Sequence, residues 1–337
     1  MSIKVAINGF GRIGRLALRV MEDDPKFEVV AINSMSGAET AAYLLKYDTA
    51  QGRFMEDKIT YTDEALLIDG REVRVCTERE AINLPWKELE VDVVLECSGF
   101  YASKEKSQAH IDAGAKKVLI SAPASGDLKT VVFNVNDDIL NSDDIIVSGA
   151  SCTTNCLAPI VKVLDDKFGV VRGYMTTVHA FTNDQNTLDG SHKKGIHSRR
   201  GRTAAGNMVP TTTGAATALG KVIPHLDGKL GGAAIRVPTV TGSCVDLMVR
   251  LKDQNLTVED INTAVKEAAN ETLGYTEDPI VSSDCIGMYY GSLFDAQSTT
   301  VMTVDGHQII KVLAWYDNEM SYTAQLVRTC EKMGNLK

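Results

Sequence analysis

The stretch that decides the fold is Gly9-Phe10-Gly11-Arg12-Ile13-Gly14, a G-x-G-x-x-G pattern near the start of the 337-residue chain. An apolar run at residues 4–8 precedes it and predicts a strand, and residues 12–21 have the spacing of a helix. In this context the first glycine permits a tight turn, the second lets the backbone approach a pyrophosphate, and the third lets the helix press on the strand. The helix N-terminus offers N–H groups and a partial positive charge to phosphates. The pattern therefore predicts a dinucleotide-binding site built on Gly9, Gly11 and Gly14.

Strand and helix patterns alternate through the first half of the chain. Strands are predicted at residues 27–32, 91–97 and 117–121, and helices at 38–45 and 104–113. The run Val-Asp-Val-Val-Leu-Glu-Cys at 91–97 is apolar on both faces, as in a parallel sheet covered by helices. We therefore expect an α/β fold whose first domain, residues 1–151, is a doubly wound parallel-sheet dinucleotide-binding (Rossmann) domain.

The pattern changes at about residue 150. A long helix at 153–168 leads to a strand at 171–180 and a polar, Gly-rich loop at 183–206. Strands at 233–237, 243–251 and 308–316 follow, with a helix at 258–272. This order favours an α+β domain with a mostly antiparallel sheet at residues 152–317. We expect the last helical segment, residues 318–337, to pack back on the first domain.

Composition argues against several classes of protein. The formal charge is −9, with 35 basic and 44 acidic residues, which does not suit a general nucleic-acid-binding surface. No stretch approaches the roughly 18–20 apolar residues of a membrane span, and the first residues do not resemble a secretory signal, so we expect a cytoplasmic protein. Seven scattered cysteines argue against a disulfide framework, and none completes the spacing of a metal site. The chain also has one basic stretch, for which composition alone favours a solvated loop. This stretch contains His192, Lys193, Lys194, His197, Arg199, Arg200 and Arg202.

Cys152 stands where a loop meets the long helix. A thiol at a helix N-terminus is exposed to the helix dipole and to amide donors, which favour the thiolate, the form that attacks carbonyls. The helix of some 16 residues runs about 24 Å outward, and a strand of about eight residues returns about 26 Å. The two lengths nearly cancel, so we expect His179 beside Cys152 as its base, in a catalytic second domain. Cys156, one helical turn further in, is interpreted as a packed core residue.

The expected acidic residue for the adenosine ribose is missing. Such a site usually has Asp or Glu at the end of the second strand, about 20 residues after the glycines, to bind the ribose 2′-OH. This chain has Asn33-Ser34 there. Because Ser34 is neutral, the repulsion that normally excludes a 2′-phosphate is absent, which leaves NAD, NADP or both open.

The sequence resembles the phosphorylating glyceraldehyde-3-phosphate dehydrogenases from its first strand to its last helix. The resemblance lies in residues 7–15 (Ile-Asn-Gly-Phe-Gly-Arg-Ile-Gly-Arg), 150–156 (Ala-Ser-Cys-Thr-Thr-Asn-Cys) and 315–319 (Trp-Tyr-Asp-Asn-Glu). It implies oxidation and phosphorylation of glyceraldehyde 3-phosphate to 1,3-bisphosphoglycerate, in glycolysis and gluconeogenesis. It further implies a Cys152 thioester, hydride transfer to NAD(P), no metal and a homotetramer.

The resemblance also assigns roles to residues. Cys152 is implied as the nucleophile and His179 as its base. The substrate phosphate is implied to bind Thr182 and Arg236. Inorganic phosphate is implied to bind Ser151, Thr153, Thr213 and Gly214, with help from Arg200, for which Arg202 is the alternative. Further contacts to the cofactor are implied for Arg12, Ile13, Arg79, Ser121 and Asn318.

Two departures from the family pattern point the same way. Ser34 stands where NAD-dependent members have Asp, and Gly190-Ser191 where they usually have Leu-Pro. Ser191 resembles the serine of the NADP-using chloroplast forms, in a loop implied to reach the adenosine ribose of a neighbouring subunit. Together they predict that NADP is accepted. The stretch 193–198 is longer than usual, which leaves Arg200 and Arg202 as alternatives.

Two other functions remain open from the sequence. A hydrolytic erythrose-4-phosphate dehydrogenase would use the same cysteine and histidine but pass its thioester to water. A non-enzymatic binding protein on this scaffold would use the basic loop, although it would need neither Cys152 nor His179.

Overall fold

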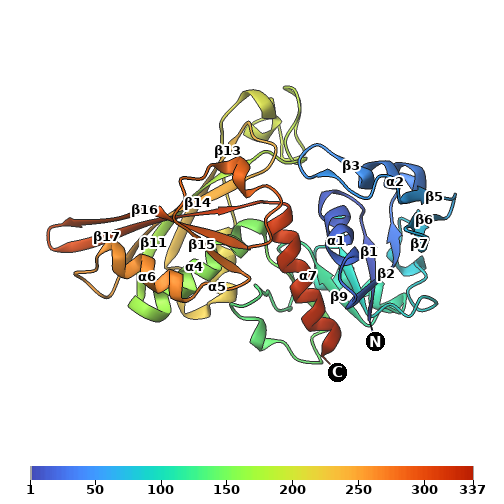
Figure 1. Cartoon of the computed structure of the whole chain (residues 1–337), viewed down its shortest axis with the longest axis horizontal. Coiled ribbons are helices and arrows are strands. Elements are labelled where there is room, and N and C mark those ends of the chain that lie inside the picture. The colour runs from blue at the N-terminus through green and yellow to red at the C-terminus, as the bar shows by residue number, and fades with distance from the viewer. Residues whose placement is uncertain (1, 337) are drawn as a thin grey trace. The chain divides into compact units, whose positions relative to one another are not determined.

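A computed structural model of the chain describes residues 2–336, and Figure 1 traces its elements. The chain divides into two compact units. The first unit consists of the residues up to Ser151 and of those from Thr323 onward. The second unit is Cys152–Tyr322. Residues 318–322 therefore group with the second unit and not with the C-terminal segment. Asn318 explains part of this, because its side chain accepts hydrogen bonds from Thr241 and Ser243.

The first unit is built on one eight-stranded sheet in the order β10-β9-β8-β1-β2-β7-β6-β5. From β10 to β7 every neighbouring pair is parallel. Its strands are β1 (Ile3–Asn8), β2 (Phe27–Asn33), β5 (Ile59–Tyr61), β6 (Ala65–Ile68), β7 (Arg71–Cys76), β8 (Val93–Glu96), β9 (Lys117–Ile120) and β10 (Ile146–Ser148). Its other elements are α1 (Arg12–Glu22), α2 (Gly37–Lys46), α3 (Lys104–Asp112), the short pair β3 (Tyr47–Asp48) and β4 (Gly52–Arg53), and 3-10 turns η1 (Ala81–Asn83) and η2 (Asp137–Ile139).

This order confirms the doubly wound fold expected from the sequence. The chain leaves β1 toward β2 on one side and returns to β8 on the other, so the direction of winding reverses between β1 and β8. In such sheets ligands bind at the carboxyl ends of the strands beside this reversal. The glycine-rich turn follows β1 and therefore lies at that point.

One edge of the sheet differs from the expected parallel arrangement. Strands β5, β6 and β7 form an antiparallel meander. The turn between β6 and β7 is Asp69-Gly70, and both residues have positive φ, 49° and 83°. An Asp-Gly pair with two positive φ angles makes the tight turn whose twist suits a hairpin. The Asp-Gly pair is the local feature of the sequence that indicates this hairpin.

The second unit contains a seven-stranded, mostly antiparallel sheet in the order β12-β13-β11-β14-β17-β16-β15. Its strands are β11 (Val170–Ala180), β12 (Val209–Thr211), β13 (Leu230–Val237), β14 (Ser243–Leu251), β15 (Leu273–Thr276), β16 (Ser292–Val304) and β17 (His307–Tyr316). Its helices are α4 (Cys152–Phe168), α5 (Ala215–Val222) and α6 (Val258–Glu267), with 3-10 turns η3 (Arg199–Gly201), η4 (Ala204–Gly206), η5 (Pro224–Leu226) and η6 (Ser282–Cys285). Helix α7 (Met320–Asn335) begins in this unit and continues into the first. Helices α4, α5 and α6 cover one face of the sheet (Figure 1).

The turn after β1 is sterically specific at two of its three glycines. Gly9 has φ +94°, and a Cβ on it would lie 2.5 Å from the backbone nitrogen of Ser98. A Cβ on Gly14 would lie 2.3 Å from the carbonyl oxygen of Gly9. A Cβ on Gly11 would meet nothing within 4 Å. Gly9 and Gly14 are thus required by packing, whereas Gly11 leaves open space above the turn.

We expect Gly9→Ala to destabilise the first unit by about 3 kcal/mol, because it combines backbone strain with a backbone clash. Gly11→Ala, the matched control, should change the unfolding free energy by less than about 0.5 kcal/mol. Urea denaturation of both variants measures the difference. Equal effects would show that the close approach of Gly9 to Ser98 does not constrain the fold.

Candidate active site

The structure brings Cys152 and His179 together. Cys152 is the first residue of α4, and His179 is the last but one of β11, the strand that follows this helix. The Sγ atom of Cys152 lies 3.5 Å from Nε2 of His179. Cys152 is half-buried and His179 is buried, 4% exposed. The site therefore contains a sulfur and an imidazole nitrogen within hydrogen-bonding distance.

The second ring nitrogen of His179 fixes its tautomer. Nδ1 lies 2.6 Å from the carbonyl oxygen of Ala180. A carbonyl oxygen can only accept a hydrogen bond, so in the neutral ring Nδ1 carries the proton. The lone pair of Nε2 is then directed toward the sulfur. His179 is prepared to accept a proton from Cys152.

The pKa shifts of this pair act against the thiolate expected from the sequence. Burial, and then the nearby charge of Arg236, lowers the pKa of His179 to about 4. Burial also raises the pKa of the Cys152 thiol, and the opposing effects of Arg236 and of hydrogen bonds from Thr153 do not cancel it. Both shifts favour a neutral thiol beside a neutral imidazole and act against the thiolate that the helix N-terminus favours.

Tyr316 is a further residue of this site, which the sequence did not single out. Its hydroxyl lies 3.0 Å from Oγ1 of Thr153 and 2.8 Å from Oγ1 of Thr177. Its ring packs edge-on against the His179 imidazole, with 5.9 Å between centroids. Tyr316 thus ties the start of α4 to β11. Only its position in the Trp315–Glu319 motif hinted at a role.

Arg236 lies on β13, directly beside His179 of β11. Its Nη1 donates to Oγ1 of Thr182 at 2.8 Å and more weakly to Oε1 of Gln185 at 3.4 Å. Burial, and then the charge of Arg200, lowers the pKa of Arg236. Two guanidinium groups close enough to repel each other favour an anion between or beside them.

Arg200 and Arg202 are arranged differently, although both come from the basic stretch. Arg200 is 14% exposed and binds Asp184 and Oγ1 of Thr211. Arg202 is 65% exposed and pairs with Asp189. Burial alone would raise the pKa of Asp184, but hydrogen bonds from Lys193 and Arg200 outweigh it and lower the pKa to about 2. The charge of Arg200 lowers the pKa of both His179 and Arg236.

The other predicted phosphate and nicotinamide residues lie at element ends. Thr213 accepts a hydrogen bond from the Ala215 amide, and Gly214 is the N-cap of α5. Ser151 directly precedes Cys152 in the chain. Asn318 is buried, and its Oδ1 accepts hydrogen bonds from the hydroxyls of Ser243 and Thr241, at 3.0 and 3.2 Å. With its oxygen satisfied, the Asn318 NH₂ group is oriented to donate elsewhere.

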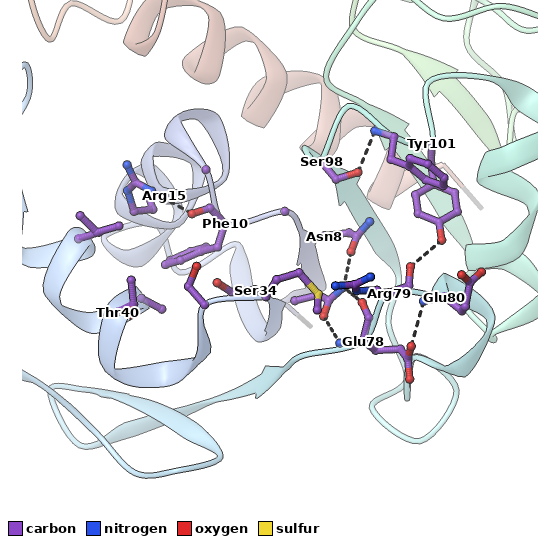
Figure 2. Close-up of a pocket in the computed structure, with 18 residues that line it drawn as sticks. Asn8, Phe10, Arg15, Ser34, Thr40, Glu78, Arg79, Glu80, Ser98 and Tyr101 are labelled. Atoms are coloured by element: carbon purple, nitrogen blue, oxygen red, sulfur yellow. Dashed lines mark hydrogen bonds between the residues drawn. The ribbon is translucent and has the colours of Figure 1, made fainter. Parts of the chain in front are cut away.

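The first unit contains a cavity of about 560 Å³ at the carboxyl ends of its strands. Figure 2 shows its wall, where Phe10, Ser34 and Arg79 surround the opening. Gly9, Gly11, Ser34 and Arg79, all predicted cofactor contacts, line it. Its size, and the open space above Gly11, fit a dinucleotide approaching the backbone closely.

Five of the other predicted cofactor contacts lie elsewhere. The Arg12 guanidinium forms a two-pronged ion pair with Asp48 and does not line the cavity. Ile13 follows it on α1 and Gly14 packs beneath the turn. Ser121 follows β9, where its amide donates to the Glu96 carbonyl. Ser191 is exposed in the second unit, where its carbonyl accepts from Asn186.

Within residues 2–336, no three or more His, Cys, Asp or Glu side chains come together as a group that could hold a metal ion. None of the helices in this range combines the length and the apolar character that a membrane-spanning helix needs.

The chain joins a doubly wound dinucleotide-binding unit to a unit with a cysteine–histidine pair and clustered arginines. This combination defines a class, the cysteine-dependent aldehyde dehydrogenases that act on phosphorylated substrates. Comparison with known families gives the particular one. Residues 3–104 match the NAD binding domain, and residues 151–318 the C-terminal domain, of glyceraldehyde 3-phosphate dehydrogenase. The chain belongs to the glyceraldehyde-3-phosphate dehydrogenase family.

Curated relatives agree along almost the whole chain. The glyceraldehyde-3-phosphate dehydrogenase of Clostridium pasteurianum is 60% identical over 328 residues, 97% of each chain. That of Clostridium acetobutylicum is 59% identical over 326 residues, again 97% of each. That of Streptococcus pyogenes is 55% identical over 332 residues, 98% of each.

Burial of neutral His179 makes stability depend on pH. Its pKa in the folded chain, about 4, lies below the ordinary value of 6.5, so between these values the unfolded chain binds a proton that the folded chain does not. The free energy of unfolding should therefore fall by up to about 3 kcal/mol from this group as the pH is lowered from about 6.5 to about 4.

We expect His179→Gln to lose this part of the pH dependence in urea denaturation. Exposed His197 provides the control, and His197→Gln should keep the wild-type profile. Identical slopes for wild type and His179→Gln would contradict the buried neutral imidazole.

Proposed function

We propose that this chain oxidises glyceraldehyde 3-phosphate and phosphorylates the product to 1,3-bisphosphoglycerate, as in glycolysis and gluconeogenesis. The observation that carries the proposal is the 3.5 Å approach of Cys152 Sγ to the unprotonated Nε2 of His179. The names of the curated relatives support the same substrate. Bound NAD(P) supplies the acceptor for the hydride.

The first step follows from the protonation states of the pair. The Cys152 sulfur adds to the aldehyde carbon while its proton passes to Nε2 of His179. The resulting hemithioacetal oxygen is stabilised by the Cys152 amide and by the imidazolium. Collapse of the oxyanion to a carbonyl needs no proton, so His179 keeps its proton through this step. Loss of hydride from the same carbon leaves a thioester on Cys152.

The second step releases the product. Inorganic phosphate attacks the thioester carbon, and the carbon–sulfur bond breaks. The departing Cys152 sulfur takes back a proton from His179, which restores the neutral pair. His179 therefore acts as base in one half-reaction and as acid in the other.

Two anion sites are needed, and we assign them to the arginine cluster. Thr182 and Arg236 bind the substrate phosphate, and Arg200 contributes to the inorganic phosphate. Arg200 is preferred to Arg202 because its charge acts on Arg236 and His179. The inorganic phosphate site is completed by Ser151, Thr153, Thr213 and Gly214.

The cofactor contacts are proposed on the same basis. Gly9, Gly11, Ser34 and Arg79 contact the dinucleotide in the cavity of the first unit. Asn318 donates its NH₂ group to the nicotinamide amide. Arg12, Ile13, Gly14, Ser121 and Ser191 complete the proposed set, of which Arg12 contributes through its backbone. Neutral Ser34 supports use of NADP as well as NAD.

We also propose a homotetramer. Tyr174 of β11 and Met248 of β14 are paired across the sheet and are 54% and 48% exposed. Large apolar side chains exposed together on a sheet face favour association with another subunit. A cytoplasmic location remains a prediction.

Steady-state turnover with glyceraldehyde 3-phosphate and NAD should depend strongly on inorganic phosphate, because phosphate takes up the acyl group. Cys152→Ala should abolish turnover while NAD still binds, since the thiol performs chemistry and does not hold the cofactor. The assay is the absorbance of reduced cofactor with and without phosphate.

Cys156→Ala is the matched control, one turn further along α4, and should keep turnover if the helix folds. Turnover that is fast without phosphate would indicate hydrolysis instead. An inert wild-type protein would favour a binding function.

Ser34→Asp should lower kcat/KM for NADP at least ten-fold relative to NAD, because it restores repulsion against the 2′-phosphate. Asn is similar in size to Asp but neutral, so Ser34→Asn should leave the ratio of kcat/KM for NADP to that for NAD nearly unchanged. Steady-state kinetics with both cofactors measure it. An unchanged NADP/NAD ratio in Ser34→Asp would show that another residue sets the preference.

A further inference from the structure

A fully buried carboxylate lies beneath the wall of the first-unit cavity. Glu96 is the last residue of β8, and its side chain is inaccessible to solvent. The side-chain amide of Asn8 donates to its Oε2 at 2.5 Å, and Nε2 of His110 lies 3.0 Å from the same oxygen. The amide and hydroxyl of Ser98 both donate to Oε1, at 2.7 and 2.5 Å. Four donors thus surround one buried acidic group, which satisfies a charge that burial would otherwise make costly.

His110 is held in one orientation by a second buried residue. The indole Nε1–H of Trp86 donates to Nδ1 of His110 at 3.1 Å. An indole N–H can only donate, so Nδ1 is the acceptor and the proton of the neutral ring resides on Nε2. That proton is directed at Glu96. Trp86 and His110 are both fully buried, which leaves no solvent to replace these bonds.

The network reaches the cavity through two strand ends and the turn after a third strand. Asn8, Asn33 and Ser98 all line the cavity, and Asn8 and Ser98 appear on its wall in Figure 2. Asn33 donates to Oδ1 of Asn8 at 2.7 Å, so Glu96 indirectly joins β1, β2 and the turn after β8. Gly9 packs against the backbone of Ser98, and its amide donates to the Asn33 carbonyl at 3.0 Å. The glycine-rich turn therefore rests on residues that Glu96 holds.

We infer that Glu96, oriented by His110, is a positioning residue for dinucleotide binding, which acts by fixing Asn8, Asn33 and Ser98 beneath the glycine-rich turn. The inference rests on the proposed function, because it requires that the cavity binds the dinucleotide. Neither side chain lines the cavity, so both act through the residues that do.

Glu96→Gln tests the acceptor side of this network. The carboxamide NH₂ group would oppose a donor, either from Ser98 or from Asn8 and His110, and one buried bond would be lost. We expect equilibrium titration with NAD to show binding weakened on the order of ten-fold. The KM for NAD should rise similarly, while kcat at saturating NAD stays within about two-fold, because the cysteine–histidine pair is in the other unit.

His110 provides a pair of variants that separates hydrogen bonding from packing. His110→Gln retains a donor near the position of Nε2, and His110→Leu removes it at similar volume. We expect His110→Leu to weaken NAD binding as Glu96→Gln does, and His110→Gln to restore most of it. These two His110 variants test the inference if Glu96→Gln does not fold.

Glu22→Gln is the matched control, because Glu22 pairs with Arg71 in the same unit away from the cavity. It should bind NAD like wild type. The inference is overturned if folded Glu96→Gln and His110→Leu bind NAD as tightly as wild type, or if His110→Gln is as weak as His110→Leu. Failure of the wild type to bind NAD would instead overturn the proposed function, and this inference with it.

Discussion

The chemistry of the second unit depends on the hydrogen bond between Nδ1 of His179 and the Ala180 carbonyl. Without it the imidazole could carry its proton on Nε2 and offer the sulfur a donor instead of an acceptor. The bond also fixes the ring plane against Tyr316, whose hydroxyl connects α4 to β11. Helix and strand then have one relative position at the site. The 3.5 Å approach of sulfur to nitrogen is a consequence of that rigid frame.

Electrostatics at this site work through burial as much as through charge. The arginines favour anions, yet they also help to keep His179 neutral, since Arg236 and Arg200 both lower its pKa. The same burial raises the pKa of Cys152. A neutral thiol is less prone to indiscriminate reaction than a thiolate, and an imidazole nitrogen able to take up its proton lies 3.5 Å away.

Features encoded in consecutive residues were predictable from the sequence. The glycine-rich turn was one, because G-x-G-x-x-G between a strand and a helix has a specific physical meaning. The pairing of Cys152 with His179 was another, because a helix followed by a strand of similar length returns the chain to its start. The Asp69-Gly70 hairpin had a local signal too, although it lay in a stretch without clear periodicity.

Features that depend on contacts between distant residues were not predictable in this way. Tyr316 meets Thr153 across 163 positions, and no local pattern reports such a contact. The burial that raises the pKa of Cys152 could not be predicted for the same reason, since burial is a property of the whole unit. Arg12 illustrates a third case: the motif placed it at the start of a helix, but its partner Asp48 could be found only in three dimensions.

The two buried histidines show how one side chain serves opposite purposes. In His179 a backbone carbonyl holds the proton on Nδ1, so Nε2 is an acceptor for a thiol. In His110 an indole donor occupies Nδ1, so Nε2 keeps the proton and donates to a carboxylate. The imidazole itself does not determine which nitrogen carries the proton, because the two neutral tautomers are close in energy in water. The residue that contacts Nδ1 determines the tautomer in each case. A histidine in this fold can therefore be assigned a role only when the contacts of both ring nitrogens are known.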